Sequence, residues 1–589
     1  MIHKNGTSHI CPGRKEGKKK PESCDFDQDV ARRALACMMI MHEYPSYIVE
    51  QIGFRRFVQA LQPLFTMVCR KTIKSDILEI YDVERAKTME AIGRNRGRVA
   101  VTTGMWTFGN QKGGCMVITA HFIDDSWKLQ SRILRLVYMP RPHTAQGLCD
   151  ALMDTFLDWK IERKLSTITV DDCFTNDSMI PLLLEKVDPN TMLWSQSLFH
   201  VRCAVHILNL IVQDGLVVIK EAIEKIRDSA MFWTASPKRE EIFEETIRQL
   251  SIPFSKKLSL DCATRWKSTF FMLQTAIEYK DAFSHLKHSD TQYKTAPTEN
   301  DWKLTTEICG ILKVFYNVTE FFSGTKYPTA NEFFAEICEI KIALSEWVLS
   351  ENVVVRNMAS KMVERYDKYW TSVHGILGVA TVLDPHYKMT LMEFYFPRIF
   401  VIDSNQKIEA IRKLCYDLLT EYQGKLSKGV GESSSKVVSS FGVGGALSDY
   451  YKWVSNRKRI KTSPVKSEFD QYLEVEVEGL PKSPGFDILA WWNSIGSRYP
   501  TLQAIAKDVL AIPVSTVASK AAFSTSGRIV NANRSRLHPK TLEVLMCAQS
   551  WLTALECEGE PAMPMQLFGT INYDVDDDCA SSARNVDDQ

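Results

Sequence analysis

The chain has 589 residues, 45% of them hydrophobic and 24% charged. This composition is that of a globular protein and excludes a collagen, a coiled coil or a wholly disordered chain. Its 72 Lys and Arg nearly balance its 71 Asp and Glu, so the net charge does not indicate the kind of partner. The 15 cysteines include no Cys-x-x-Cys pair, which favours reduced thiols in an intracellular protein. No apolar run reaches the roughly 18 residues of a membrane helix, so we expect no membrane partner.

The predicted elements begin with a polar arm at residues 1–24, which we expect to be disordered. Its basic residues are Arg14, Lys15, Lys18, Lys19 and Lys20. Residues 25–96 carry apolar side chains at the three- and four-residue spacing that is typical of helices. We therefore predict a helical N-terminal region after the arm.

An α/β pattern occupies residues 97–190. Three runs of apolar residues there, alternating in the first two, predict an antiparallel meander of three strands. The runs lie near residues 99–102, 116–123 and 133–138. A helix over 144–162, a strand over 166–170 and a helix ending at Glu185 are predicted to follow. We expect Asn176 or Asp177 to be the N-cap of that second helix.

The rest of the chain is predicted to be mostly helical. Residues 191–423 show helical patterning with weak strand signals, and residues 424–468 have the composition of a flexible linker that carries a basic cluster. Helical periodicity returns within residues 469–556, and residues 557–589 form an acidic tail. The order of strands and helices is that of a ribonuclease-H-like fold, although other α/β units share it.

Six segments carry a more specific signal. They are "RVAVTTGMWTFGNQKGGCMVITAHFID", "TITVDDCFTND", "HVRCAVHILNLIVQDGL", "DCATRW", "VLDPHYKM" and the long segment that begins "WWNSIGSRYPTLQAIAKDVLAIPVSTVASKAAFS". In this order they resemble hAT-superfamily transposases, and especially the plant zinc finger BED domain proteins of the ricesleeper and daysleeper type. The resemblance implies an α/β, ribonuclease-H-like core that is split by a large all-α insertion and completed by a C-terminal helical dimerisation segment.

The resemblance also implies a catalytic site. Transposases of this superfamily use two Asp and one Glu to hold divalent metal ions, because these hard cations require several oxygen ligands. The matching positions here are Gly104, Asp171 and Lys520. Glycine has no side-chain oxygen, and an ammonium repels a divalent cation. We therefore expect Asp171 to be a relic, with no resident Mg²⁺, and the protein not to be an enzyme.

Other acidic residues do not replace the missing ligands in this interpretation. We expect them at the opposite sheet edge, on the other strand face, or several helical turns away. They are, in that order, Asp124 and Asp125, then Asp172, then Asp508 and Glu543. An active or recently decayed transposase or nuclease is the alternative interpretation.

A second set of candidate ligands consists of His200, Cys203 and His206, which we expect at i, i+3 and i+6 on one helix. Three interpretations stay open: packing, a role in the family's conformational or DNA-flanking element, and zinc binding. A fourth zinc ligand is not evident, so no metal site is predicted. Zinc would require a complete BED finger upstream, of which residues 1–24 resemble only the end.

Candidate DNA contacts are the five basic residues of the arm, together with Arg265 and Trp266. Arg265 could bind phosphate and Trp266 could stack on a base. The alternative for Trp266 is packing at the start of a helix, with Asp261 or Thr264 as the cap. The basic runs in the arm and at residues 456–461 would also serve as nuclear-import signals, so we expect the nucleus as the location.

The C-terminal helices carry an apolar band that is broader than one helix needs in a monomer core. The resemblance identifies this region as the dimerisation segment, and we expect a homodimer or a heterodimer with related proteins. Burial within one chain is the alternative. The expected interface residues are Trp491, Trp492, Tyr499, Leu502 and Phe523. The sequence thus predicts a domesticated, transposase-like nuclear protein that binds DNA, dimerises and has lost strand transfer.

Overall fold

The computed structural model describes residues 26–107, 113–189, 196–254, 256–262, 265–370, 374–400, 402–433, 467–475, 486–520 and 538–556. The chain divides into two compact units, residues 1–82 and residues 83–589. The basic arm, the acidic tail and Phe523 lie outside the described residues, so the predictions made for them stay predictions.

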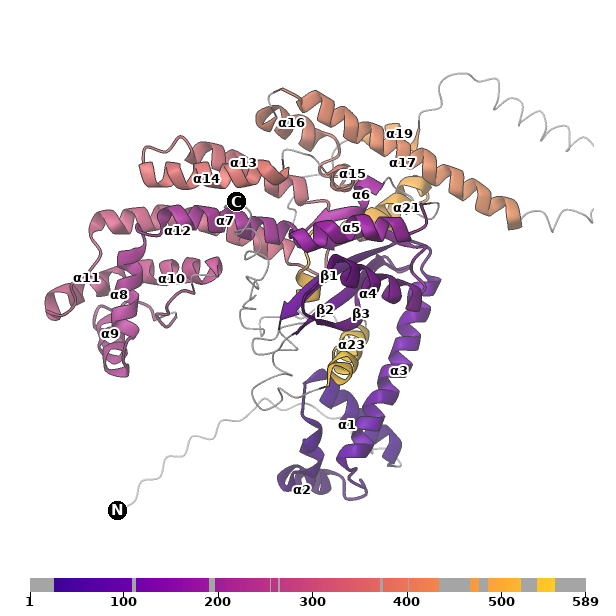
Figure 1. Ribbon diagram of the computed structural model, residues 1–589, viewed down its shortest axis with the longest axis horizontal. Helices are drawn as coiled ribbons and strands as arrows, with labels where there is room; N and C mark the ends of the chain where they lie inside the picture. The colour runs from indigo at the N-terminus through magenta and orange to yellow at the C-terminus, as the bar shows by residue number, and fades with distance from the viewer. Residues whose placement is uncertain are drawn as a thin grey trace, which may run out of the picture. The chain divides into compact units, whose positions relative to one another are not determined.

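A five-stranded mixed sheet is the centre of the larger unit (Figure 1). Three strands form the predicted antiparallel meander: β1 (Val99–Thr107), β2 (Gly113–Ile123) and β3 (Leu129–Pro140). β4 (Leu165–Val170) lies parallel to β1, and β5 (His200–Arg202) lies parallel to β4. The strand order is β3-β2-β1-β4-β5, and the ribonuclease-H-like prediction is confirmed. β5 was not predicted, because three residues are too few to show an alternating pattern.

Helices pack beside this sheet. They are α4 (Ala145–Asp158), α5 (Phe174–Lys186), α6 (Gln196–Phe199) and α23 (Pro539–Glu556). α23 is fixed to β3 through Trp551, whose indole Nε1 donates a hydrogen bond to the carbonyl of Ile133 at 2.9 Å. The prediction that Asn176 or Asp177 caps α5 is wrong. α5 begins earlier, after Cys173, and Asn176 instead donates a hydrogen bond to the Asp171 carbonyl at 2.9 Å.

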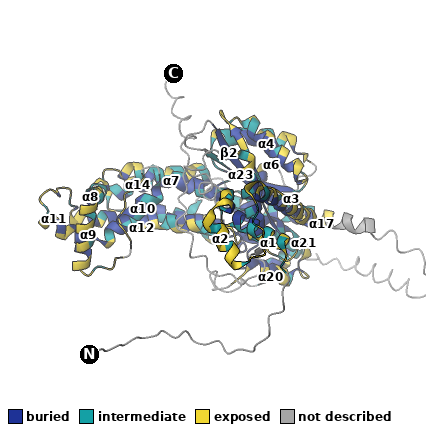
Figure 2. Ribbon diagram, turned by 90° about the horizontal axis from the view of Figure 1, so that it is seen from below, coloured by how far each residue is buried: buried dark blue, intermediate teal, exposed yellow. Residues whose placement is uncertain are grey.

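A large helical insertion follows β5, as predicted. Its helices are α7 (Ala204–Ile219), α8 (Glu224–Thr234), α9 (Pro237–Gln249), α10 (Trp266–Glu278), α11 (Lys280–Ser289), α12 (Glu299–Phe322), α13 (Phe333–Trp347), α14 (Val353–Trp370), α15 (Gly375–Val382), α16 (Thr390–Ile399) and α17 (Ser404–Ser433). α7 lies beside α12 and α14 (Figures 1 and 2). α17 continues to Ser433, so the predicted linker does not begin at residue 424.

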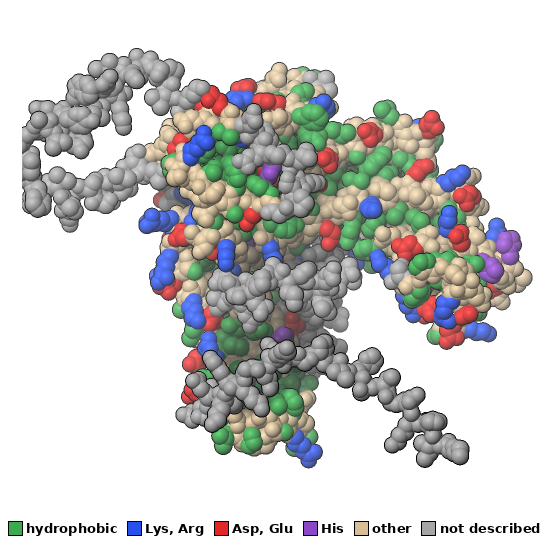
Figure 3. Space-filling model, turned by 180° about the vertical axis from the view of Figure 1, so that it is seen from behind, with side chains coloured by type: hydrophobic (Ala, Val, Ile, Leu, Met, Phe, Trp, Pro, Cys, Tyr) green, Lys and Arg blue, Asp and Glu red, His purple; other side chains and the backbone are tan. Residues whose placement is uncertain are grey.

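Most apolar side chains of the insertion face its interior. One continuous hydrophobic cluster runs from β1 and β5 through the insertion to the C-terminal helices. Some apolar side chains stay on the surface of the insertion (Figure 3), among them Val217 and Leu349, which are 76% and 83% exposed. Within the described parts of the chain, no helix is both long and apolar enough to cross a membrane.

The C-terminal segment closes the larger unit. It contains α19 (Glu468–Glu474), α20 (Ile488–Ile495) and α21 (Pro500–Val509). For three of the expected interface residues the alternative holds, which is burial within one chain. Trp492, Tyr499 and Leu502 are at most 2% exposed within one chain, because the band packs on the insertion and on the sheet. Trp491 is partly buried in the same cluster.

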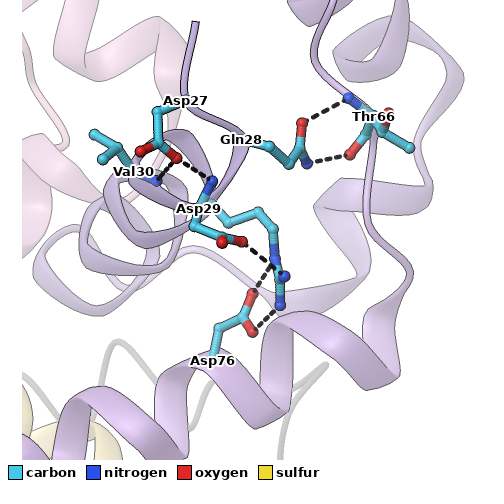
Figure 4. Close-up of polar contacts among 7 residues, drawn as sticks. Asp27, Gln28, Asp29, Val30, Thr66 and Asp76 are labelled. Carbon is cyan, nitrogen blue, oxygen red and sulfur yellow. Dashed lines mark hydrogen bonds and ion pairs between the residues drawn. The ribbon is translucent and has the colours of Figure 1, made fainter.

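The smaller unit is helical, as predicted for this part of the chain. It contains α1 (Gln28–Met41), a 3-10 helix (Ser46–Glu50), α2 (Ile52–Leu61) and the start of α3 (Arg70–Arg94). The Asp27 side chain caps α1 by accepting hydrogen bonds from two backbone amides (Figure 4). Arg32 on α1 pairs with Asp76 on α3 at 2.6 Å. These contacts fix α1 against the first turns of α3.

Candidate functional site

Asp171 lies at the carboxyl end of β4, immediately after six buried strand residues. Its two carboxylate oxygens have separate partners. Oδ2 is 2.7 Å from the Nζ ammonium of Lys520, and Oδ1 accepts a hydrogen bond from the Thr516 hydroxyl at 2.8 Å. Residues that are far apart in the sequence thus meet at one strand end, and the two predicted site residues Asp171 and Lys520 are in direct contact.

The ion pair keeps Asp171 ionised. Burial alone would raise the pKa of the Asp171 carboxyl, but the positive charge of Lys520 and the hydrogen bonds from Lys520 and Thr516 outweigh it. The pKa of Asp171 is therefore held well below its usual range. Both side chains are largely buried, with Asp171 20% exposed and Lys520 18% exposed, so solvent screens the pair only weakly.

Lys520 is held in place by the residue before it. The Ser519 hydroxyl is 2.8 Å from the Thr102 hydroxyl on β1 and 3.1 Å from the Thr119 hydroxyl on β2. Thr102 is in turn 2.9 Å from His121 Nε2. Burial lowers the pKa of His121 to about 3, so this imidazole is neutral near pH 7. The short segment after α21 is therefore fastened to β1, the strand that contains Gly104, and to its neighbour β2.

Gly104 is buried in β1 opposite Val117. Because glycine has no side-chain oxygen, β1 contributes no carboxylate at this position. Of the three positions to which the resemblance assigns metal ligands, one holds a carboxylate, one holds an ammonium and one has no side chain. Within the described residues, no group of three or more His, Cys, Asp or Glu is arranged to hold a metal ion.

The other acidic residues all have different partners. Asp172 pairs with Arg202 and accepts a hydrogen bond from Tyr369 at 2.5 Å. Asp508 accepts hydrogen bonds from the Arg98 backbone amide and the Tyr422 hydroxyl, both at 2.6 Å. The remaining three are engaged with turn or surface residues: Asp124 with the β2–β3 turn, Asp125 with Lys507, and Glu543 with Arg135.

The expectation that His200, Cys203 and His206 share a helix is wrong. His200 begins β5, Cys203 is the N-cap of α7, and His206 lies in the first turn of that helix. The Cys203 sulfur accepts a hydrogen bond from the His206 amide at 3.4 Å and one from the Thr516 amide at 3.3 Å. Burial raises the pKa of the Cys203 thiol to about 11. Cys203 thus links α7 to the segment that carries Lys520, and the packing interpretation holds for it.

Trp266 is the first residue of α10 and is only 4% exposed. This burial contradicts its predicted availability for base stacking and fits the packing alternative. Arg265 is the N-cap residue of α10 and is partly exposed, so its phosphate contact stays a prediction. Asp261 does not cap α10. It accepts two hydrogen bonds from Arg227, at 2.9 and 2.8 Å, and one from Thr269.

Replacing Thr516 with Val should lower the free energy of unfolding by about 1.5–3 kcal/mol at neutral pH, since it removes a hydrogen bond to a buried carboxylate. A lowered folded-state pKa means that this contribution is complete above the unfolded Asp pKa of about 3.9 and is lost as the pH falls through the folded value. Urea unfolding across the acidic range should therefore show the difference shrinking with acidification.

Ser515→Ala is the matched control, because the Ser515 hydroxyl donates to the Phe322 carbonyl at 2.7 Å. Loss of that neutral hydrogen bond should cost less, about 0.5–1.5 kcal/mol, and the cost should not depend on pH. A pH-independent loss in Thr516→Val would contradict the ionised state of Asp171.

Comparisons with known proteins agree with this architecture. Four family models match the chain: the ZBED1 RNase-like domain over residues 102–199, the ZBED1 RNase-like helical domain over 201–311, the hAT-like transposase, RNase-H fold over 331–422, and the hAT family C-terminal dimerisation region over 468–552. Their ranges follow the sheet, the insertion and the closing helices.

Curated relatives extend the likeness over almost the whole chain. The zinc finger BED domain-containing protein RICESLEEPER 2 of Oryza sativa subsp. japonica is 36% identical over 92% of this chain and 76% of its own length. The zinc finger BED domain-containing protein DAYSLEEPER of Arabidopsis thaliana is 33% identical over 90% of this chain and 74% of its own. The putative AC transposase of Zea mays is 35% identical over 90% of this chain and 66% of its own.

Proposed function

This chain belongs to the hAT transposase superfamily, in the group of the plant BED-type RICESLEEPER and DAYSLEEPER proteins, and from that membership we propose that it is a transposase-derived nuclear protein that binds DNA, dimerises and no longer transfers DNA strands. The proposal rests mainly on one contact, the ion pair of Lys520 with Asp171.

The ion pair bears on catalysis because of what metal-dependent strand transfer requires. Two-metal chemistry needs several carboxylate oxygens that converge on the ions. Here the Lys520 ammonium lies 2.7 Å from the one carboxylate of the site, and Gly104 adds none. A divalent cation at Asp171 would have to displace a fixed positive charge. This arrangement supports the loss of activity, and we propose no resident Mg²⁺.

Family membership supports the remaining parts of the proposal. The match to the hAT dimerisation region supports a homodimer or a heterodimer with related proteins. Because Trp492, Tyr499 and Leu502 are buried within one chain, we propose that the exposed faces of this region make the contact. The relatives are named BED-type zinc finger proteins, which supports DNA binding and a nuclear location. Zinc would enter only with a complete BED finger upstream.

An active transposase is the second candidate, favoured by the likeness to a putative transposase of Zea mays. Incubating the full chain with duplex DNA and Mg²⁺ or Mn²⁺ separates the two candidates. We expect retention of the DNA without cleavage, and a dimer in sedimentation measurements. Metal-dependent cleavage that disappears in Asp171→Ala would overturn the loss of activity, and failure to bind DNA would overturn the binding role.

A further inference from the structure

A row of exposed cations lies at the sheet edge opposite Asp171. We call Arg96, Lys128, Lys160 and Arg163 the basic edge. Arg96 precedes β1, Lys128 precedes β3, and Lys160 and Arg163 precede β4. All four side chains are exposed, and none forms an ion pair with another residue that the structure describes. The six residues of β4 separate this edge from Asp171 by about 20 Å at 3.3 Å per residue.

Strand pairing places these four residues close together. Val99 at the start of β1 lies opposite Leu165 at the start of β4, and Leu129 at the start of β3 lies opposite Ile123 at the end of β2. The four residues therefore lie at the ends of four neighbouring strands, whose order in the sheet is β3-β2-β1-β4. Adjacent strands are about 4.8 Å apart, so the row spans roughly 15 Å.

Lys164 fixes the central part of this edge. Its ammonium donates hydrogen bonds to the carbonyls of Ile92, Gly93 and Asn95 at 3.1, 2.8 and 2.8 Å. These contacts fasten the end of α3 to the loop between α4 and β4. Arg96 directly follows Asn95, and Arg163 directly precedes Lys164. The hydrogen bonds of Lys164 therefore hold the two arginines on adjacent segments of the chain.

Acidic residues at the same edge are mostly occupied. Asp125 pairs with Lys507 at 2.7 Å, and Asp124 accepts hydrogen bonds from the amides of Ser126 and Lys128 within its own turn. Glu162 is the remaining acid of the α4–β4 loop and is half-buried. The exposed charge of the edge is therefore mainly positive.

Lys160 gives a separate indication that the positive charge has a role. It ends α4 in a left-handed conformation, with φ of 55°, and the next amide, of Ile161, donates to the Phe156 carbonyl at 2.9 Å. Glycine is the usual residue at such a helix end, because a side chain there strains the backbone. The chain instead carries a cation at a position where glycine would be less strained.

We propose that the basic edge binds the phosphate backbone of duplex DNA, on the side of the sheet away from the former catalytic site. This inference rests on the proposed DNA-binding function and assigns a surface to it. A row of unpaired Lys and Arg is suited to phosphates, which bind without regard to sequence. Base stacking would need exposed aromatic rings, and the one aromatic residue beside Lys128, Trp127, is partly buried.

The test measures binding of the full chain to a fluorescent duplex by anisotropy, as a function of salt. The edge variant combines Arg96→Ala, Lys128→Ala, Lys160→Gly and Arg163→Ala. Loss of four phosphate contacts should reduce the slope of log K against log salt by about 3–4 and weaken binding about 1,000-fold near 0.1 M salt. Lys160→Gly alone should weaken binding without lowering the melting temperature, because it relieves the left-handed strain.

A matched control removes the same charge elsewhere, with Lys220, Lys287, Lys294 and Lys413 changed to Ala, all exposed on the insertion. Its slope should change by less than about 1. An edge variant that keeps the wild-type slope, or falls no further than this control, would overturn the surface while leaving DNA binding intact. Absence of DNA binding by the wild-type chain would overturn the proposed function as well. Preference for single-stranded RNA over duplex DNA would also overturn the proposal.

Discussion

Replacing Trp492 with Ala is expected to lower the free energy of unfolding by about 3–5 kcal/mol. Trp492 is completely buried, and its indole Nε1 donates a hydrogen bond to the Leu383 carbonyl at 2.9 Å. Its ring packs 5.6 Å from that of Tyr472 and 5.1 Å from that of Trp491, between centroids. The substitution removes this packing and leaves a buried carbonyl without its donor, which adds to the loss. Urea unfolding of the full chain measures it.

Trp491→Ala is the natural control, because Trp491 is the neighbouring Trp and is only partly buried. Its replacement should cost less than half as much stability. The two variants also test whether Trp492 contributes to the dimer interface. If Trp492→Ala weakened association of protomers while leaving the stability of each protomer unchanged, then Trp492 would be an interface residue and its burial within one chain would not represent the solution state.

The sheet could be predicted because its strands carry a strong local signal. In β1 and β2 the residues alternate, and the turns between the strands are short and polar, so the meander followed from pattern alone. β5 has three residues and leaves no such signal. The helical assignment of His200 failed for that reason, since only pairing with β4 makes the segment a strand.

The candidate site, like the sheet, could be predicted only in part. Family likeness identified Asp171 and Lys520 as site positions, and the chemistry of a glycine and an ammonium followed from the residue types. Thr516 and Ser519 were not identified as parts of the site, and Cys203 was considered only with His200 and His206, as a separate set of candidate ligands. Their roles depend on contacts that span more than 300 residues, such as Thr516 with Asp171, and local sequence patterns do not encode such contacts.

Burial of the C-terminal apolar band illustrates a limit of amphipathicity arguments. A band that is too broad for one helix indicates that several surfaces cover it, but not whether they belong to one chain or two. Here a large insertion supplies those surfaces from the same chain, through contacts such as Trp492 to Leu383 and Ser515 to Phe322. The breadth of the band is therefore explained by its contacts with the insertion of the same chain.

Replacing Lys520 with Glu is expected to destabilise the chain by about 3–5 kcal/mol, because the change leaves Asp171 without its partner and adds a second carboxylate beside it. Two neighbouring carboxylates form a partial site for a hard divalent cation. Mn²⁺ should therefore restore part of the lost stability, by about 2.7 kcal/mol at a concentration 100 times its dissociation constant. The wild-type chain should show no comparable stabilisation, since the ammonium already neutralises Asp171. Thermal unfolding with and without Mn²⁺ measures both effects.

Lys520→Gln distinguishes the two changes that Lys520→Glu combines, which are the loss of the ammonium and the gain of a carboxylate. Glutamine removes the ammonium without adding a carboxylate, so this variant should be destabilised but not rescued by Mn²⁺. Adding Gly104→Asp to Lys520→Glu should strengthen Mn²⁺ binding further if β1 lies within reach of the same ion, because it supplies a third carboxylate. Equal stabilisation of the wild-type chain and Lys520→Glu by Mn²⁺ would contradict the interpretation that Lys520 excludes the metal. If instead only the carboxylate variants respond, then the missing carboxylate at position 520 accounts for the loss of the metal site, and the Lys520 ammonium supplies the positive charge that keeps Asp171 ionised.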